Sequence, residues 1–247
     1  MVEAVGGGNL ARFRTICETD NFGCRILSAY TAFGGDPTLT TMVSDGGAAL
    51  SLKGGSAVVC GNDDPELTEC LAVLGCREIF APANIAFPAG FEISTGPVAL
   101  LTGVRETDFD RAEKIDAENL REIYPVIVSD LPGIASQPFD AWYVELSHRL
   151  RHANARIYAV REHGRIVSVA MTAAESDSAA VIGFVRTLRE YRGRGCASGL
   201  CGVLGNELLG EKKKVYISCN ADTLPFYEKL GYRYVYGWKY GKRISDE

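Results

Sequence analysis

One stretch of the chain decides how it is interpreted: Val185-Arg186-Thr187-Leu188-Arg189-Glu190-Tyr191-Arg192-Gly193-Arg194-Gly195-Cys196-Ala197. It joins a predicted strand over 179–187 to a predicted apolar helix over 197–209. Glycines in such a turn let main-chain N–H groups converge on one point, and a helix start adds its positive dipole end. Arg192 and Arg194 supply further charge. The stretch predicts an anion site suited to a diphosphate, with a solvated turn as the alternative.

The elements around this stretch alternate between strands and helices. Their apolar periodicity predicts a helix over 142–150, strands over 156–161, 165–173 and 214–219, a helix over 223–230 and a strand over 232–240. A polar, helix-forming segment is expected from Thr107 through Tyr124, and a loop that shapes the acceptor pocket over 125–141. This succession predicts a mixed α/β domain.

The first 104 residues repeat the same rhythm with shorter elements. Helices are expected near 10–17 and 24–30, hairpin strands between 39 and 60, a helix opened by Asp63-Asp64-Pro65-Glu66, and strands over 77–80 and 98–101. The strand over 56–60 is followed by no Arg/Gly loop. An internal duplication is the interpretation, with a boundary near Gly103 that separates domains 1–104 and 105–247.

Two motifs carry a resemblance to a known family. Arg192 to Ala197 fills the pattern R/Q-x-x-G-x-G/A, and the stretch from Asn220 to Tyr232 contains N…F-Y-x-K-x-G-[FY]. In both, the chain resembles the GCN5-related N-acetyltransferase (GNAT) family over residues 105–247, most closely over 156–236. Residues 1–104 are similar to the degenerate amino-terminal copy of tandem members. The resemblance implies an α/β (α+β) fold: a mixed, mainly antiparallel sheet flanked by helices, splayed at its central parallel strand pair, with a second smaller GNAT-like half.

The resemblance also implies a role for particular residues. The diphosphate of acetyl-CoA, a co-substrate, would bind the main chain of Arg192, Gly193, Arg194, Gly195, Cys196 and Ala197. The pantetheine arm would lie along the strand from Val185 to Thr187, supported by Asn220. Tyr227 would stand near the sulfur and protonate the departing thiolate, because a phenol within hydrogen-bond reach can act as a general acid.

The general base is less clearly marked than the acid. The strand over 179–187 carries no carboxylate, although many family members place a glutamate there. Glu175 is the candidate, with Asp177 and Glu145 as further acids, an ordinary surface position as the alternative for each, and a water chain as another route. The predicted function is acetyl transfer from acetyl-CoA to a primary amine of a small molecule or peptide by direct attack. A non-catalytic CoA-binding sensor or structural module is the alternative.

The amino-acid composition argues against other classes of function. The 247 residues have a formal net charge of −5, with 5 basic and 11 acidic side chains before residue 105 and 21 and 20 after it. This balance argues against nucleic-acid binding, which would otherwise use the basic carboxyl-terminal region. No apolar run is long enough for a membrane helix, and no secretory leader is recognised, so a cytoplasmic location is expected.

The eight cysteines lack metal-ligand spacing, so reduced thiols and no metal are expected. Aromatic residues alternate from Tyr232 to Tyr240. One face of a terminal strand explains them, and the alternative is a substrate surface or a homodimer interface.

Overall fold

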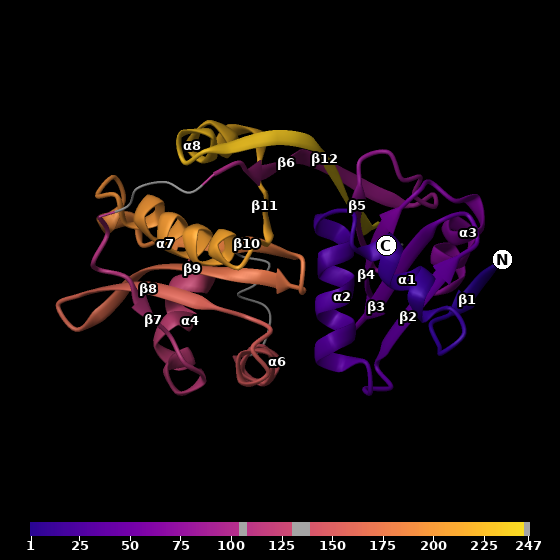
Figure 1. Ribbon diagram of the computed structural model, residues 1–247, viewed down its shortest axis with the longest axis horizontal. Helices are drawn as coiled ribbons and strands as arrows, with labels where there is room; N and C mark the ends of the chain where they lie inside the picture. The colour runs from indigo at the N-terminus through magenta and orange to yellow at the C-terminus, as the bar shows by residue number, and fades with distance from the viewer. Residues whose placement is uncertain (104–107, 130–138, 245–247) are drawn as a thin grey trace. The chain divides into compact units, whose positions relative to one another are not determined.

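The computed structural model describes residues 1–103, 108–129 and 139–244 (Figure 1). The chain forms two compact units that are not continuous in sequence. The first comprises Met1–Leu100, Ser218–Pro225 and Tyr234–Glu247, and the second comprises Leu101–Ile217 and Phe226–Arg233. The division of the chain into domains 1–104 and 105–247 therefore stays a prediction.

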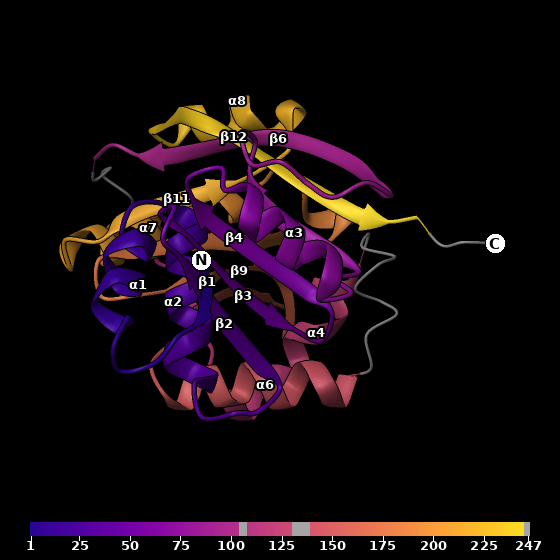
Figure 2. The same ribbon diagram turned by 90° about the vertical axis from the view of Figure 1, so that its right-hand side faces the viewer.

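The first unit is a sheet covered by three helices. Its elements are β1 (Val2–Ala4), α1 (Leu10–Cys17), α2 (Asn21–Phe33), β2 (Leu39–Ser44), β3 (Ala48–Lys53), β4 (Ser56–Gly61), α3 (Pro65–Val73), β5 (Glu78–Pro82), most of β6 (Phe91–Leu101) and most of β12 (Tyr232–Arg243). Strands β1 to β4 are antiparallel neighbours (Figure 2). Strand β5 runs parallel to β4 and antiparallel to β12. Helices α1 and α2 pack on β3 and β4. Leu67 of α3 lies in a core cluster with Leu50, Val59 and Ile79 of the strands.

The second unit repeats this arrangement around longer strands. Its elements are β7 (Glu113–Lys114), the 3-10 turn η1 (Ala117–Asn119), α4 (Leu120–Val128), α6 (Phe139–Arg151), β8 (Ile157–Glu162), β9 (Arg165–Glu175), β10 (Ala179–Thr187), η2 (Arg189–Tyr191), α7 (Cys196–Gly210), β11 (Lys214–Ser218, its last residue in the first unit) and α8 (Leu224–Lys229, which begins in the first unit). Helix α7 covers one face of β8 to β10, and α4 and α6 cover the other (Figure 1).

The order of elements and of strand pairing recurs in the two units. In each, a short first strand pairs antiparallel with the strand after two helices (β1 with β2, β7 with β8). Two hairpin-connected strands follow, and a helix then leads to a fifth strand that pairs in parallel with the fourth (β5 with β4, β11 with β10). The mixed α/β fold predicted from the sequence is confirmed, and its parallel pair lies where the sequence placed it.

The segment before the second hairpin differs from expectation. The helix was expected from Thr107, which lies outside the described residues, but Glu113 and Lys114 form β7, because they pair with Ala159 and Tyr158 at the edge of β8. The helix α4 then runs through Pro125 to Val128, since Ile123, Val126 and Ile127 on one face are buried in the core. The acceptor loop expected over 125–141 is thus helical at both ends, and its residues 130–138 lie outside the described part.

Three further properties concern the described residues as a whole. No helix within 1–103, 108–129 and 139–244 has the length and apolar character needed to cross a bilayer. Within the same ranges, no group of three or more His, Cys, Asp or Glu side chains is placed to hold a metal ion. All eight cysteines are free thiols, and seven of them are buried.

Candidate active site

The central parallel pair of the second unit ends before β10 does. Strands β10 and β11 pair from Ala179 with Lys214 to Ile182 with Ile217. The strand β10 continues to Thr187 along β9 alone, through a bulge where Phe184 has φ of +50°. A bulge re-aims a strand and interrupts its ladder. The last residues of β10 thus diverge from β11 just before the Gly/Arg loop.

The loop and the start of α7 present main-chain N–H groups. Gly193 and Gly195 have φ of +75° and +78°, values that glycine adopts without the steric cost of a side chain. Gly195 is the residue before the helix and makes no side-chain cap. The first intrahelical bond runs from the Gly199 N–H to the Gly195 carbonyl, 2.9 Å. The N–H groups of the first turn, at Cys196, Ala197 and Ser198, precede that bond and form the kind of helix start that binds anions.

The two loop arginines fold back along the loop. Arg192 donates from Nε to the Thr187 carbonyl at 3.0 Å, and Arg194 donates from Nη2 to the Glu190 carbonyl at 3.0 Å. The Arg194 guanidinium also lies 3.7 Å from the Glu162 carboxylate and 5.1 Å from the centre of the Tyr191 ring. Their contacts brace the loop while keeping two positive charges at it.

The strand residues predicted to hold the pantetheine arm are partly engaged within the unit. The Val185 carbonyl accepts a bond from Arg186 Nη1 at 3.0 Å, and the Thr187 hydroxyl lies 2.8 Å from that of Ser168. Cys196 is buried, with its thiol 3.9 Å from Arg111 Nη2. Its side chain therefore faces the interior, and only its main chain is available at the loop.

The acid and the supporting amide lie in different units. Tyr227 belongs to the second unit, where its largely buried ring packs 4.9 Å from the Phe226 ring and 5.8 Å from the Tyr232 ring, centre to centre. Asn220 belongs to the first unit, where its carbonyl accepts from the Thr223 and Leu224 N–H groups. The roles of Tyr227 and Asn220 at the cofactor stay predictions.

Glu175, the candidate base, lies in an ion-pair network at the end of β9. Its carboxylate is 2% exposed and lies 3.1 Å from both Arg156 Nη2 and Lys213 Nζ. The Thr172 hydroxyl donates a third contact at 2.9 Å. Arg156 also pairs with Glu211 and holds the pKa of that carboxyl at about 2. These contacts are those of a structural carboxylate, whose charge two cations stabilise.

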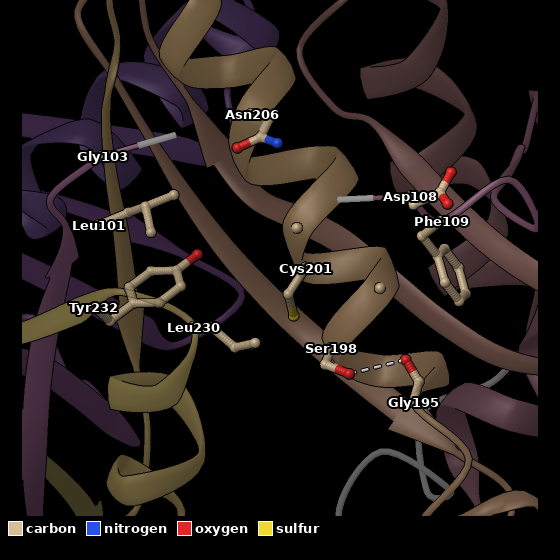
Figure 3. A pocket seen from close by; sticks show the side chains of 12 residues that line it. Leu101, Gly103, Asp108, Phe109, Gly195, Ser198, Cys201, Asn206, Leu230 and Tyr232 are labelled. Carbon is tan, nitrogen blue, oxygen red and sulfur yellow. Dashed lines mark hydrogen bonds between the residues drawn. The ribbon is translucent and has the colours of Figure 1, made fainter. Parts of the chain in front are cut away.

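A pocket of about 380 Å³ adjoins the helix start (Figure 3). It is lined by Leu101, Gly103, Asp108, Phe109, Gly195, Ser198, Gly199, Cys201, Gly202, Asn206, Leu230 and Tyr232. Burial raises the pKa of the Cys201 thiol to about 12 and the pKa of Tyr232 well above its usual value. The Tyr232 hydroxyl is buried and has no hydrogen-bond partner among the described residues.

Sequence reasoning missed three residues that shape this site. Arg111 donates to the Arg194 carbonyl, Phe109 packs on Gly199, and Glu162 bridges two arginines. Arg111 and Phe109 precede β7, in a segment taken for a helix, and no motif marks them. Glu162 lies in the β8–β9 hairpin, more than 30 residues from the loop. Only the three-dimensional arrangement brings these residues to α7.

Comparison with known proteins agrees with this geometry. Residues 118–232 match the family model described as Acetyltransferase (GNAT) family. A GNAT-family protein of Novosphingobium aromaticivorans is similar in structure (TM-score 0.61, 19% identity, 92% of this chain and 100% of that chain). A GCN5-related N-acetyltransferase of Sphaerobacter thermophilus is also similar (TM-score 0.63, 15% identity, 100% of this chain and 97% of that chain). So is a tandem GNAT protein from the clavulanic acid biosynthesis pathway (TM-score 0.57, 16% identity, 100% of this chain and 100% of that chain). Among curated proteins, none matches the chain in sequence.

The fold and the loop define a class of protein: a mixed α/β domain with the acetyltransferase fold, in which one helix starts without a side-chain cap, as helices that bind diphosphates do. In particular, residues 118–232 match the GNAT family model, and the resemblance to that family drawn from the two sequence motifs is confirmed over this part of the chain. Acyl transfer is the chemistry consistent with that family. At these identities the structural neighbours show the fold alone.

Proposed function

We propose that the protein is an N-acetyltransferase that moves an acetyl group from acetyl-CoA to a primary amine by direct attack. The observation that carries the proposal is the start of α7. Gly195 opens the helix in the left-handed conformation without a side-chain cap, beside a strand that outruns its parallel partner. The first-turn N–H groups and helix dipole would bind the diphosphate, and Arg192 and Arg194 would add charge.

The reaction needs no co-reactant beyond the two substrates and water. The amine nitrogen attacks the thioester carbonyl carbon, a C–N bond forms, and the C–S bond breaks with its electron pair leaving on sulfur. The ammonium proton passes to water, the thiolate takes a proton from the Tyr227 hydroxyl, and water returns a proton to the Tyr227 phenolate. Holding donor and acceptor together on one scaffold supplies much of the rate by proximity. Main-chain N–H groups at the diverging end of β10 would polarise the thioester carbonyl.

A CoA-binding protein without turnover is the second candidate. It is favoured by one observation: β10 carries no carboxylate, and Glu175, the candidate base, is held by Arg156 and Lys213. Such a protein would bind acetyl-CoA through the same helix start. Turnover with an amine separates the two candidates.

Thermal unfolding with acetyl-CoA is the first experiment. Ligand at 100 times its dissociation constant should raise the free energy of unfolding by about 2.7 kcal/mol. An unchanged melting temperature at millimolar acetyl-CoA would contradict both candidates. Release of free CoA thiol in the presence of a panel of primary amines then tests catalysis.

Replacement of the proposed acid tests the mechanism. Tyr227→Phe should lower kcat about 100-fold with little change in the KM for acetyl-CoA, because it removes proton donation and leaves the donor's binding contacts. The matched control is Tyr30→Phe in α2 of the first unit, which should turn over as wild type does. Wild-type kcat in Tyr227→Phe would show that another group protonates the thiolate.

A further inference from the structure

The segment before β7 is fastened to the start of α7 by an aromatic ring. A Cβ atom built on Gly199 would lie 2.3 Å from Cδ2 of Phe109, so the ring sits directly on the helix backbone. Figure 3 shows Phe109 beside the first turns of α7, close to Gly195 and Ser198. Only glycine at position 199 allows this approach. Phe109 therefore fixes the residues that follow it relative to the loop.

Arg111 is the residue that this attachment places at the loop. Its guanidinium carbon lies 5.0 Å from the centre of the Phe109 ring. From Nη2 it donates to the main-chain carbonyl of Arg194 at 3.3 Å, and from Nη1 to Oε1 of Glu162 at 3.2 Å. Glu162 in turn faces the Arg194 guanidinium at 3.7 Å. One carboxylate thus holds two arginines, of which one binds the loop's main chain and the other belongs to the loop.

The contact to Arg194 sets the direction of the next N–H group. A trans peptide is planar, and its carbonyl and N–H point to opposite sides. The carbonyl of Arg194 and the N–H of Gly195 share one peptide, so fixing the carbonyl on Arg111 turns that N–H away from Arg111. A flip of this peptide changes ψ of Arg194 and φ of Gly195, and glycine at 195 leaves the flip otherwise open because it accepts either sign of φ.

We propose that Arg111 is a positioning residue for the diphosphate loop: it holds the Arg194–Gly195 peptide in the orientation that directs the Gly195 N–H toward the anion. The inference rests on the proposed function and goes beyond it, since Arg111 belongs to neither sequence motif. Glu162 is the second part of the device, because it holds the Arg111 guanidinium against the loop.

Affinity for two donors of different length tests this role. CoA carries the diphosphate, and S-acetylpantetheine lacks it. Arg111→Ala should raise the dissociation constant for CoA and the KM for acetyl-CoA about tenfold, as expected for one lost charge-assisted contact. The kcat and the KM for S-acetylpantetheine should stay at wild-type values. Arg111→Lys, which keeps one donor, should recover part of the lost CoA affinity.

Two further variants separate positioning from simple charge attraction and from a general loss of stability. Glu162→Gln removes a negative charge near the loop. If Arg111 acts through position, this variant weakens CoA binding, whereas attraction alone would strengthen it. Arg77 makes a comparable contact in the first unit, from Nη2 to the Gly54 carbonyl at 2.6 Å, so Arg77→Ala should leave CoA affinity unchanged.

The outcomes distinguish this inference from the proposed function. Wild-type protein that binds no CoA would overturn the proposed function and this role with it. Wild-type binding with unchanged affinity in Arg111→Ala, or tighter binding in Glu162→Gln, would overturn the role of Arg111 alone. Equal losses for CoA and S-acetylpantetheine would also overturn it, because the effect would not depend on the diphosphate.

Discussion

The starts of helices α3 and α7 occupy the same place in the two units and have opposite chemistry. Each helix follows the strand that pairs in parallel with the next one, β4 before α3 and β10 before α7. At α3, the Asp64 carboxylate caps the helix by accepting from the Glu66 N–H at 2.9 Å, and Pro65 at the first position has no N–H. At α7, Gly195 provides no side chain at all.

Charge adds to this difference. Glu66 lies in the first turn of α3, and the amino-terminal ammonium group of Met1 lies 2.6 Å from its carboxylate. The first turn of α7 has no acidic residue, and its loop holds Arg192 and Arg194. A helix start that already carries its own carboxylates is a poor site for a diphosphate, whereas an uncapped one is a good site. The same topology thus gives a helix start capped by the protein's own carboxylate in the first unit and an uncapped helix start in the second.

Placing an acidic cap like that of α3 at the start of α7 should have the largest effect on CoA affinity. Gly195→Asp places a carboxylate where the diphosphate is proposed to bind, and should weaken CoA binding about 100-fold, the equivalent of losing one or two charge-assisted hydrogen bonds. Titration calorimetry with CoA measures it. The matched control is Gly75→Asp at the end of α3, where φ is +65° and a Cβ meets no atom within 4 Å. That variant has similar backbone strain and should keep wild-type affinity; an equal loss in both would mean that strain alone acts.

Removing the first unit's cap should affect stability and not binding. Asp64→Ala leaves the Glu66 N–H without its acceptor and should lower the free energy of unfolding by about 1 kcal/mol. Urea unfolding gives the value, with the exposed Glu69→Ala on the same helix as a near-neutral control. CoA affinity should be unchanged. An Asp64→Ala protein that binds CoA more tightly than wild type would show that the first helix start also takes part in binding.

A pair of tyrosines gives the smallest and most local comparison between the units. Within the described part of the chain, the buried Tyr232 hydroxyl of the second unit has no hydrogen-bond partner, whereas the Tyr236 hydroxyl of the first unit donates to Asn21 Oδ1 at 2.9 Å. Tyr232→Phe removes an unsatisfied polar group and should raise the free energy of unfolding by up to about 1 kcal/mol. Tyr236→Phe should lower it by a similar amount. Destabilisation by Tyr232→Phe would indicate a partner for its hydroxyl in solution, such as a bound water.

The parts of the fold with local signals could be predicted from the sequence. The strand over 179–187 has the predicted bounds, and α7 begins one residue before its prediction, because Gly195 marks the helix start by its backbone freedom. The short β7 could not be predicted in this way. Its two residues become a strand only through pairing with β8, a contact made more than 40 residues away in sequence.

In the candidate site, too, only the residues with a local sequence signal could be predicted. The loop from Arg192 to Ala197 has a sequence pattern, so its residues could be named in advance. The ion pairs of Glu175 with Arg156 and Lys213 join the end of β9 to the residues just before β8 and β11, and no spacing in the sequence predicts them. The role of Arg111 could not be predicted either, because its contact with the loop depends on the packing of Phe109 against Gly199 of α7.

The place of β12 has a consequence for synthesis of the protein. This strand comes about 150 residues after β5 in the sequence, yet Trp238 to Lys242 pair with Pro82 to Glu78 on β5. A ribosome therefore releases β12 long after the early hairpins have emerged, and this edge of β5 stays without β12 in the meantime. The first unit completes its sheet only once β12 has been synthesised, so a stop codon before Trp238 would damage the portion made first.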